Sequence, residues 1–316
     1  MKIKYSFLKI LTGSDLSRRR LPIMQIESGR RGPVLWITAC GHGDEVGGMV
    51  IIQEIFKKIR KTGLLRGKLF AFPLMNPIGF EMGSRQVSFS MEDLNRSFPG
   101  NSSGSLAERI AEKIFTSITA TNPTLVIDLH NDWMKSIPYA LLDIKPPDHL
   151  IPICQKTADY GQSTGFLVVQ DTDDLHHTLS RSLIHEGIPA LTLEVGESFV
   201  VNEKNVDYGV KAILNVLSTL RMIEPVDEMF CHTVTAKYDG QILKFSSAPV
   251  SSSSGIIRFL VKPGDILKKD QPVARIYNAF GKLQETLLTQ QKGIVLGHAD
   301  SSVAYPGASI MAFGIL

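Results

Sequence analysis

The stretch VLWITACGHGDEVGG, residues 34–48, decides the fold, because in it an apolar run ends abruptly in a glycine-rich turn. Val34 to Ala39 is short, rich in β-branched residues and almost uninterrupted in its hydrophobicity, which is typical of a strand covered on both faces. The two glycines that flank His42 permit backbone angles closed to other residues, so the chain can turn sharply. We therefore expect a buried strand whose carboxyl end presents His42 and Glu45 together.

His42 and Glu45 supply one imidazole and one carboxylate three positions apart, which is half of a zinc site. Hydrolytic zinc sites combine His and Glu with a second histidine and keep a fourth position open for water. A histidine near a glutamate in a glycine-rich turn also occurs in an ordinary loop, and this stretch alone does not separate the two interpretations. The metal interpretation predicts a second histidine and a carboxylate at the ends of other strands.

The composition is that of a globular protein. The chain has 316 residues, 43% hydrophobic and 21% charged, which is enough for one large domain and a smaller one. The net charge of +3 is too small to indicate a nucleic acid partner, and no apolar run is long enough for a membrane helix. We see no signal-peptide cleavage site, and the three cysteines have no paired spacing, so we expect a cytoplasmic protein.

Strands and helices alternate after the first residues of the chain. Leu21 to Ser28 alternates apolar with polar residues, and we expect an edge strand there. Apolar residues recur with helical period after Glu45, and Gly63 gives this helix a stop. Lys68 to Leu74 is typical of another buried strand. Strand, helix and strand in this order predict a doubly wound α/β layer.

The segment DLNRSFPG, Asp93 to Gly100, is bounded by small polar residues and glycine and is expected to be a loop. The guanidinium of Arg96 beside the amide of Asn95 is suited to planar recognition of a carboxylate. A surface arginine in a salt bridge is the alternative, and the segment alone favours it. Ser105 and Glu108 then form a capping box for the helix that follows.

Two further apolar runs end in side chains that can take part in chemistry. Leu125 to Leu129 is followed by His130, the second histidine. Asp128 lies two positions earlier on the same side of the strand, where it can accept the free N–H of a ligating imidazole. Pro189 to Val195 carries Glu194 near its end, and a carboxylate there is costly unless it has a partner or a function.

Four motifs together resemble the succinylglutamate desuccinylase and aspartoacylase family, which is related to the zinc carboxypeptidases. They are HGDE at residues 42–45, DLNRSFPG at 93–100, DLHN at 128–131 and LEVG at 193–196. The resemblance covers roughly residues 20–225, and four motifs in the right order are far more specific than any one of them. It implies an α/β fold with a zinc-carboxypeptidase-like mixed sheet flanked by helices.

The resemblance also implies a role for each site residue. Three residues would bind one zinc ion per chain: His42, Glu45 and His130. Glu194 would act as the general base and then as the general acid. Asn95 and Arg96 would hold a substrate carboxylate, and Arg85 would polarise the scissile carbonyl group.

We therefore expect a zinc-dependent amidohydrolase that removes an acyl group from an N-acyl amino acid or a related small carboxylate. Zinc lowers the pKa of bound water, and Glu194 takes the proton and delivers it to the leaving amine. A carboxypeptidase-type metallopeptidase is the alternative, but little chain after Glu194 remains for a peptide cleft. A non-catalytic binding protein on this fold is a third. The pocket is expected to be lined by residues 131–139 and by the loop near residues 170–175.

The last part of the chain changes character, so we expect a catalytic domain over residues 1–225 and a β domain over residues 226–316. Residues 255–276 resemble the biotinyl and lipoyl hammerhead barrel, with a weaker second half over residues 293–314. The modified-lysine signature of those carriers is absent, so Lys282 is expected to be a turn residue. We expect this β module to cover a rim of the active site or to mediate contacts in a homo-oligomer.

Overall fold

The computed structural model of this chain describes residues 1–316 except residues 13–15, 17, 145–146, 173–174 and 239. The strands of the N-terminal part are β1 (Lys4–Thr12), β2 (Arg18–Glu27), β3 (Val34–Ala39), β4 (Lys68–Phe72), β5 (Leu125–Asp132), β6 (Lys135–Ser136), β7 (Tyr139–Leu142), β8 (Leu167–Gln170) and β9 (Ala190–Glu197). Its helices are α1 (Gly47–Thr62), α2 (Pro77–Met82), α3 (Leu106–Thr119), α4 (Ile151–Ser163), α5 (Leu179–His185) and α6 (Glu203–Thr219). Short 3-10 helices are η1 (Leu94–Arg96), η2 (Asp148–Leu150) and η3 (Thr235–Lys237). The strands of the C-terminal part are β10 (Ile242–Ser246), β11 (Gly255–Phe259), β12 (Ile266–Leu267), β13 (Pro272–Tyr277), β14 (Leu283–Leu288), β15 (Gly293–His298), β16 (Val303–Ala304) and β17 (Met311–Ile315).

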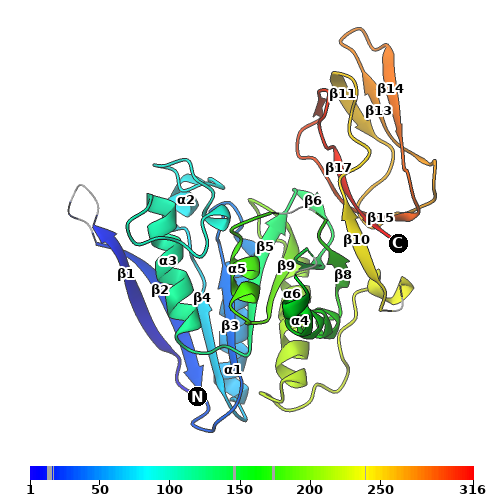
Figure 1. The fold of residues 1–316 in the computed structure, drawn as a ribbon. Coiled ribbons are helices and arrows are strands. Elements are labelled where there is room, and N and C mark those ends of the chain that lie inside the picture. Colours follow the sequence, from blue (N-terminus) through cyan, green and yellow to red (C-terminus); the bar gives the residue numbers. More distant parts are fainter. Residues whose placement is uncertain (13–15, 17, 145–146, 173–174, 239) are drawn as a thin grey trace.

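Within the described residues, 13 strands form one mixed sheet that runs through the whole molecule (Figure 1). Its order is β1-β2-β4-β3-β5-β9-β7-β8-β10-β17-β15-β12, and β6 pairs with β15. The central strands β4, β3, β5 and β9 are parallel, whereas β7 pairs antiparallel with β9. The mixed sheet that the resemblance implies is therefore confirmed.

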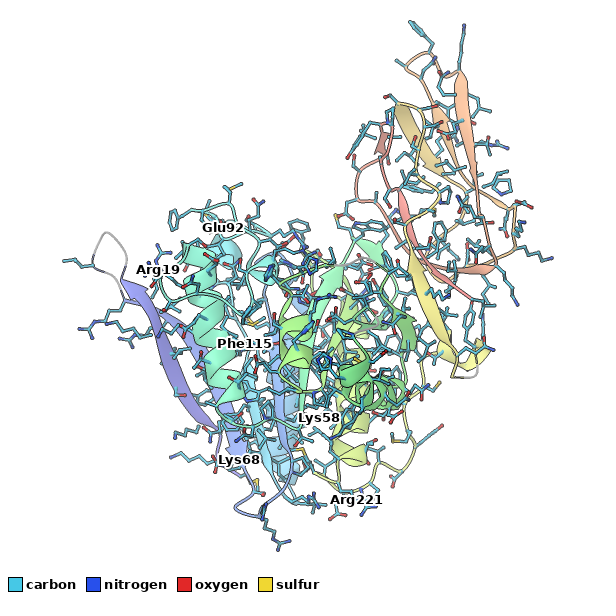
Figure 2. The ribbon with its side chains drawn as sticks, in the orientation of Figure 1. Arg19, Lys58, Lys68, Glu92, Phe115 and Arg221 are labelled. Carbon is cyan, nitrogen blue, oxygen red and sulfur yellow. The ribbon has the colours of Figure 1, made fainter. Side chains whose placement is uncertain are left out.

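The strand β3 begins at Val34 and ends at Ala39, as its apolar pattern predicts. Ile37 packs in a core with residues of α1 and α6, while Trp36 packs in a second core with residues of α3 and α5. Helices thus cover both faces of the sheet, and charged side chains such as Lys58 and Arg221 lie on the outside (Figure 2). Among the described residues, no helix is both long enough and apolar enough to cross a membrane.

The strand at the N-terminal edge of the sheet is β1, so the expected edge position of residues 21–28 is wrong. These residues lie almost entirely in β2, which pairs with β1 on one side and with β4 on the other. Leu21 packs in one core and Ile26 in the opposite core. The pattern within a strand shows which side chains are buried but not whether another strand pairs alongside it.

The predicted capping box at the start of α3 is present. The backbone N–H of Glu108 donates to Oγ of Ser105 at 3.2 Å, and the backbone N–H of Ser105 donates to Oε2 of Glu108 at 2.7 Å. Both bonds satisfy donors that the first turn of a helix leaves unpaired. The capping box fixes where α3 begins and therefore the end of the loop that precedes it.

The large sheet continues into the C-terminal part, because β10 pairs in parallel with β8 and β17, β15 and β12 follow (Figure 1). A separate antiparallel sheet, β14-β13-β11-β16, packs on this extension through a shared core that includes Ile276 and Phe313. The expected all-β C-terminal module is therefore confirmed. The domain boundary stays a prediction, as does the contact of the module in a homo-oligomer.

Candidate active site

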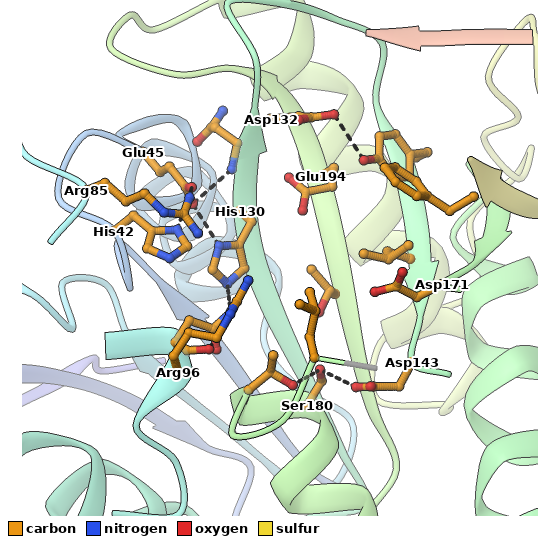
Figure 3. Close-up of a pocket in the computed structure, with 18 residues that line it drawn as sticks. His42, Glu45, Arg85, Arg96, His130, Asp132, Asp143, Asp171, Ser180 and Glu194 are labelled. Atoms are coloured by element: carbon orange, nitrogen blue, oxygen red, sulfur yellow. Dashed lines mark hydrogen bonds and ion pairs between the residues drawn. The ribbon is translucent and has the colours of Figure 1, made fainter. Parts of the chain in front are cut away.

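A cavity of about 230 Å³ lies beside the carboxyl ends of β5 and β9 (Figure 3). The carboxyl edge of parallel strands is where α/β folds bind ligands. All seven residues that the sequence predicts for the site line this cavity: His42, Glu45, Arg85, Asn95, Arg96, His130 and Glu194. The structure therefore brings together side chains that lie up to 152 positions apart in the chain.

Pairing in the sheet explains why these side chains meet. β3 and β5 are parallel, so the turn after β3 and the end of β5 lie at the same edge. In the parallel pair of β5 and β9, His130 lies opposite Glu194. Tyr139 of β7 lies opposite Glu194 on the other side. His130, Glu194 and Tyr139 therefore form a row across three strands.

The turn after β3 needs Gly43 for space, and it needs neither Gly41 nor Gly43 for unusual backbone angles, which corrects our expectation. Among these residues Cys40 has a positive φ, 52°, whereas Gly41 and Gly43 do not. A Cβ atom on Gly43 would lie 2.0 Å from the carbonyl carbon of Gly79 and 2.1 Å from the backbone nitrogen of Phe80. The start of α2 packs so closely on the turn that residue 43 has no room for a side chain.

His42, Glu45 and His130 form a compact, buried group of ligand atoms. Nδ1 of His42 lies 2.6 Å from Oε1 of Glu45, and Nδ1 of His130 lies 2.8 Å from Oε2 of the same carboxylate. One ligand atom from each residue can be chosen so that all three lie within 4.8 Å of one another. Two imidazoles and one carboxylate are the donor set of a hydrolytic zinc site with an open fourth position, so these residues fit a metal ion.

Each of the two histidines contacts an aspartate carboxylate through Nε2, the ring nitrogen that does not face Glu45. Nε2 of His130 lies 2.9 Å from Oδ2 of Asp128, as the sequence predicts, and Oγ1 of Thr38 donates to the other oxygen of Asp128 at 2.6 Å. Nε2 of His42 lies 3.0 Å from Oδ1 of Asp93, a contact the sequence did not indicate. Both Nε2–H groups can donate to these carboxylates, which leaves both Nδ1 atoms for a metal.

The carboxylates and imidazoles of this group stabilise one another's charged forms. Burial alone raises the pKa of Glu45, but the two imidazoles outweigh it and lower that pKa below its usual range. Burial likewise lowers the pKa of His42 and His130, yet the neighbouring carboxylates raise both above the usual value. Without a metal ion, the two imidazoles thus stabilise the charged form of the buried carboxylate Glu45.

Arg85, Asn95 and Arg96 lie at the rim of the cavity next to this group. Arg85 donates to Oδ2 of Asp93 from Nε at 3.2 Å and from Nη2 at 3.0 Å, and its Nη1 lies 3.6 Å from Oε1 of Glu45. The amide oxygen of Asn95 accepts the backbone N–H of Leu179 at 2.9 Å. The exposed Arg96 donates from Nη1 to the backbone oxygen of Asn95 at 2.8 Å.

Glu194 lies on the opposite side of the cavity from the arginines (Figure 3). Its Oε2 atom is buried and has no hydrogen-bond partner among the described residues. Burial and then the charge of Asp132 raise the pKa of Glu194 well above its usual range. Asp132 accepts a hydrogen bond from the Tyr139 hydroxyl at 3.0 Å, and burial raises its pKa to about 6.

The predicted lining segments contribute Asn131, Asp132, Tyr139, Asp171 and Leu175, while residues 173–174 lie outside the described residues. Other residues that line the cavity were not predicted from the sequence: Leu141, Asp143, Thr178, Ser180, Thr192 and Phe245. A signal for Asp143 existed, because the apolar run YALL precedes it just as other apolar runs precede His130. Phe245 comes from the β module, which places that module at a rim of the cavity.

Comparisons with known proteins agree with this geometry. The family model of the succinylglutamate desuccinylase/aspartoacylase catalytic domain matches residues 31–220. The chain is 24% identical over 296 residues to the N-alpha-acetyl-L-2,4-diaminobutyric acid deacetylase of Halomonas elongata, and the match covers 87% of this chain and 80% of that protein.

Solved structures share the fold over almost the whole chain. The product-bound ectoine utilization protein EutE (DoeB) of Ruegeria pomeroyi has a TM-score of 0.83 at 20% identity, covering 99% of this chain and 95% of that chain. A succinylglutamate desuccinylase/aspartoacylase of Rhodobacter sphaeroides has a TM-score of 0.83 at 20% identity, covering 99% of this chain and 94% of that chain. A metallo-carboxypeptidase of Burkholderia cenocepacia has a TM-score of 0.55 at 16% identity, covering 68% of this chain and 64% of that chain. Because the family model spans more than half of the chain, this protein belongs to the succinylglutamate desuccinylase/aspartoacylase family and is a hydrolase of amide bonds.

Proposed function

We propose that this protein is a zinc-dependent deacylase that removes the acyl group from an N-acyl amino acid or a related small carboxylate. The observation that carries the proposal is the convergence of two imidazoles and a carboxylate, His42, Glu45 and His130, in one cavity with Glu194. The Halomonas relative, which is named for deacetylation of an N-acetyl amino acid, supports it.

In the proposed reaction, each predicted site residue has a role. When bound, zinc supplies Lewis-acid chemistry beside the cavity. Glu194 takes a proton from the attacking water at its unpartnered Oε2 and delivers it to the leaving nitrogen. Arg85 polarises the scissile carbonyl group, and Asn95 and Arg96 hold the substrate carboxylate at the rim.

Two alternatives have less support. A carboxypeptidase-type metallopeptidase shares the ligand set, and the Burkholderia protein shares the fold over 68% of this chain. A cavity of about 230 Å³ suits a small amide better than a peptide. A non-catalytic binding protein has no use for three converging ligands beside a buried, unpartnered carboxylate.

We also propose a cytoplasmic location. The three cysteines are Cys40, Cys154 and Cys231, and all are free. Unpaired thiols are typical of a reducing compartment.

Metal analysis tests the ligand assignment. The parent protein should carry one zinc ion per chain, and His42→Ala should lose it. His185→Ala, at an exposed position in the last turn of α5, is the matched control and should keep zinc. Stoichiometric zinc in His42→Ala would show that the ligands are wrongly assigned.

Turnover tests the role of Glu194. Glu194→Gln should keep zinc and fold but lose roughly a hundredfold or more in kcat, because the general base is gone. Release of free amine from N-acetyl amino acids measures the rate. A variant with near-normal kcat would exclude Glu194 from the proton transfer.

A further inference from the structure

Two loops meet at the rim of the cavity, and one of them carries Arg96. The first loop is the motif of residues 93–100, which contains Asn95 and Arg96. The second loop is the segment 177–179, which leads into α5. Asn95, Arg96 and Thr178 line the cavity. The reaction proposed above uses the first loop and gives the second no role.

The second loop holds the first on both sides of Arg96. On one side, the backbone N–H of Leu179 donates to Oδ1 of Asn95 at 2.9 Å. On the other side, the backbone N–H of Phe98 donates to the carbonyl oxygen of His177 at 3.0 Å, and Nδ1 of His177 lies 3.0 Å from the carbonyl oxygen of Phe98. A carbonyl oxygen only accepts hydrogen bonds, so Nδ1 of His177 carries a proton and donates it. The backbone of Arg96 therefore lies between two residues that are held in place.

Phe98 depends on His177 for both of its backbone hydrogen bonds. Phe98 packs in the core and is 1% exposed. Its carbonyl oxygen has no second partner among the described residues. Because a buried carbonyl group without a partner is costly, loss of the His177 ring would favour a different position of the first loop.

The backbone of His177 has a conformation that is uncommon for a residue with a side chain. Its φ angle is 65°, in the left-handed region. The next residue, Thr178, caps α5, because its Oγ1 accepts the backbone N–H of Arg181 at 3.2 Å. The chain thus changes direction at His177 directly before a capped helix, and both the ring and the carbonyl oxygen of His177 contact Phe98. Such conformations persist where surrounding contacts hold them, and they cluster at binding sites.

We propose that His177 is a positioning residue that holds Arg96 where it binds the carboxylate of the substrate. Among the described residues, those that line the cavity do not include His177, which acts through the backbone of Phe98. This inference rests on the proposed function and adds a residue to its substrate site. A neutral imidazole with its proton on Nδ1 and a protonated imidazole can both donate this hydrogen bond, so the contact does not require a charged ring.

Steady-state kinetics of the zinc-loaded protein tests the inference. The first substrate is the one that the parent protein hydrolyses fastest among N-acetylnorvaline, N-acetylaspartate and Nα-acetyl-2,4-diaminobutyrate, and the second is its analogue with an amide in place of the α-carboxylate. His177→Ala should raise KM for the carboxylate substrate about threefold to tenfold, the usual effect of one lost hydrogen bond, and should change kcat less than twofold. For the amide analogue, kcat/KM should change less than twofold, because it lacks the group that Arg96 holds.

Three further variants separate the hydrogen bond from other effects. His177→Asn should restore KM to within twofold of the parent value, because asparagine tolerates the left-handed conformation and its amide nitrogen can donate in place of Nδ1. His177→Gly removes the ring without backbone strain and should raise KM as His177→Ala does. His185→Ala, in the last turn of α5, is the matched control and should leave KM unchanged.

Parent-like KM in both His177→Ala and His177→Gly overturns the inference. An equal fall of kcat/KM for the carboxylate substrate and its amide analogue also overturns it, because His177 then supports the site in general and not Arg96. A His177→Asn variant with the same KM as His177→Ala excludes the hydrogen bond as the cause and has the same consequence. In an Arg96→Ala background, His177→Ala should have no further effect on KM, and a further rise of about threefold or more overturns the link to Arg96.

Hydrogen exchange followed by mass spectrometry separates the inference from the proposed function. Peptides that cover residues 93–100 should exchange at least about fivefold faster in His177→Ala than in the parent protein and in His177→Asn, whereas peptides of α3 should not differ. If no N-acetyl amino acid is hydrolysed, this faster exchange still supports the positioning of the loop while the proposed function fails. Equal exchange in His177→Ala and in the parent protein overturns the inference.

Discussion

Among single residues, Asp93 connects two parts of the site. One of its oxygens lies 3.0 Å from Nε2 of His42, and the other accepts both hydrogen bonds of Arg85. Burial alone raises the pKa of Asp93, but His42, Arg85 and Arg96 together lower it below its usual range. The residue therefore stays charged, and it orients a candidate ligand and a candidate electrophile together.

Asp93→Asn should weaken zinc binding about tenfold to a hundredfold, because a neutral amide is a poorer acceptor for the N–H of a ligating imidazole. Competition with a chelator measures the affinity. Asp207→Asn, whose side chain is 55% exposed on α6, should bind zinc like the parent protein. Unchanged affinity in Asp93→Asn would mean that the carboxylate does not support His42.

Asp143 should make the stability of the protein depend on pH. Burial is the main cause that raises its pKa from 3.8 to about 6, so the folded state favours the protonated form. Its contribution to the free energy of unfolding is therefore most favourable below pH 3.8 and declines as pH rises to about 6. Above that range the full penalty for a buried charge applies.

Asp143→Asn removes this penalty while an amide oxygen can still accept the hydrogen bond from Ser180. At pH 7.5 the variant should be more stable than the parent protein by about 2 to 3 kcal/mol at most, from two pKa units at 1.36 kcal/mol each. At pH 3.5 the gain should disappear. Denaturant unfolding of the zinc-free proteins at both pH values measures it, and a less stable variant at pH 7.5 would contradict the assignment.

Among the elements, the packing of α2 on the turn after β3 sets how the candidate ligands His42 and Glu45 are presented. The backbone N–H of Gly43 donates to the carbonyl oxygen of Ser84 at 3.0 Å, just past the end of α2. The absence of a side chain at Gly43 permits this contact. The motif glycine therefore positions His42 and Glu45 through a neighbouring helix.

Gly43→Ala should displace α2 or the turn and lower both zinc content and stability, the latter by about 1 to 3 kcal/mol as for overpacking. Gly41→Ala is the matched comparison, because its Cβ would first meet the flexible end of Met75 at 3.3 Å. Zinc analysis and thermal unfolding of both variants measure the difference. Equal effects of the two substitutions would show that close packing at residue 43 is not the reason for its glycine.

The elements that the sequence predicts best are those with a clear local pattern. The bounds of β3 and the capping box of α3 follow from local residues alone, and strand ends mark His130 and Glu194. Asp143 was not predicted because the apolar run before it, β7, has only four residues, too few to identify a strand by pattern alone. The roles of the site residues stay predictions, although all seven meet in one cavity.

Across the whole molecule, the β module forms part of the candidate active site. Phe245 of β10 lines the cavity, and its backbone oxygen accepts the Thr172 hydroxyl at 3.0 Å. β6 pairs with β15, and the backbone N–H of Met134 donates to Oδ1 of Asp300 at 2.6 Å. The pairing of β10 with β8 and these contacts fix the module against the cavity at two places.

Phe245→Ala should raise KM about fivefold to tenfold, which corresponds to about 1 kcal/mol of lost apolar contact with the substrate, and should leave zinc content unchanged. Phe280→Ala, a residue 89% exposed in the turn between β13 and β14, is the matched control. Steady-state kinetics on the preferred N-acyl amino acid gives both values. If KM is the same in both variants, Phe245 does not contact the substrate.

The pairing of β10 between β8 and β17 also sets an order of events during synthesis on the ribosome. When His130 and Glu194 have emerged, β8 still has an open edge, and β10 covers that edge only after residue 246 has followed. β10 in turn stays open on its far side until β17, Met311–Ile315, emerges. A chain released early therefore displays an unpaired strand edge. Chaperones and proteases can act on this edge before the chain binds a substrate.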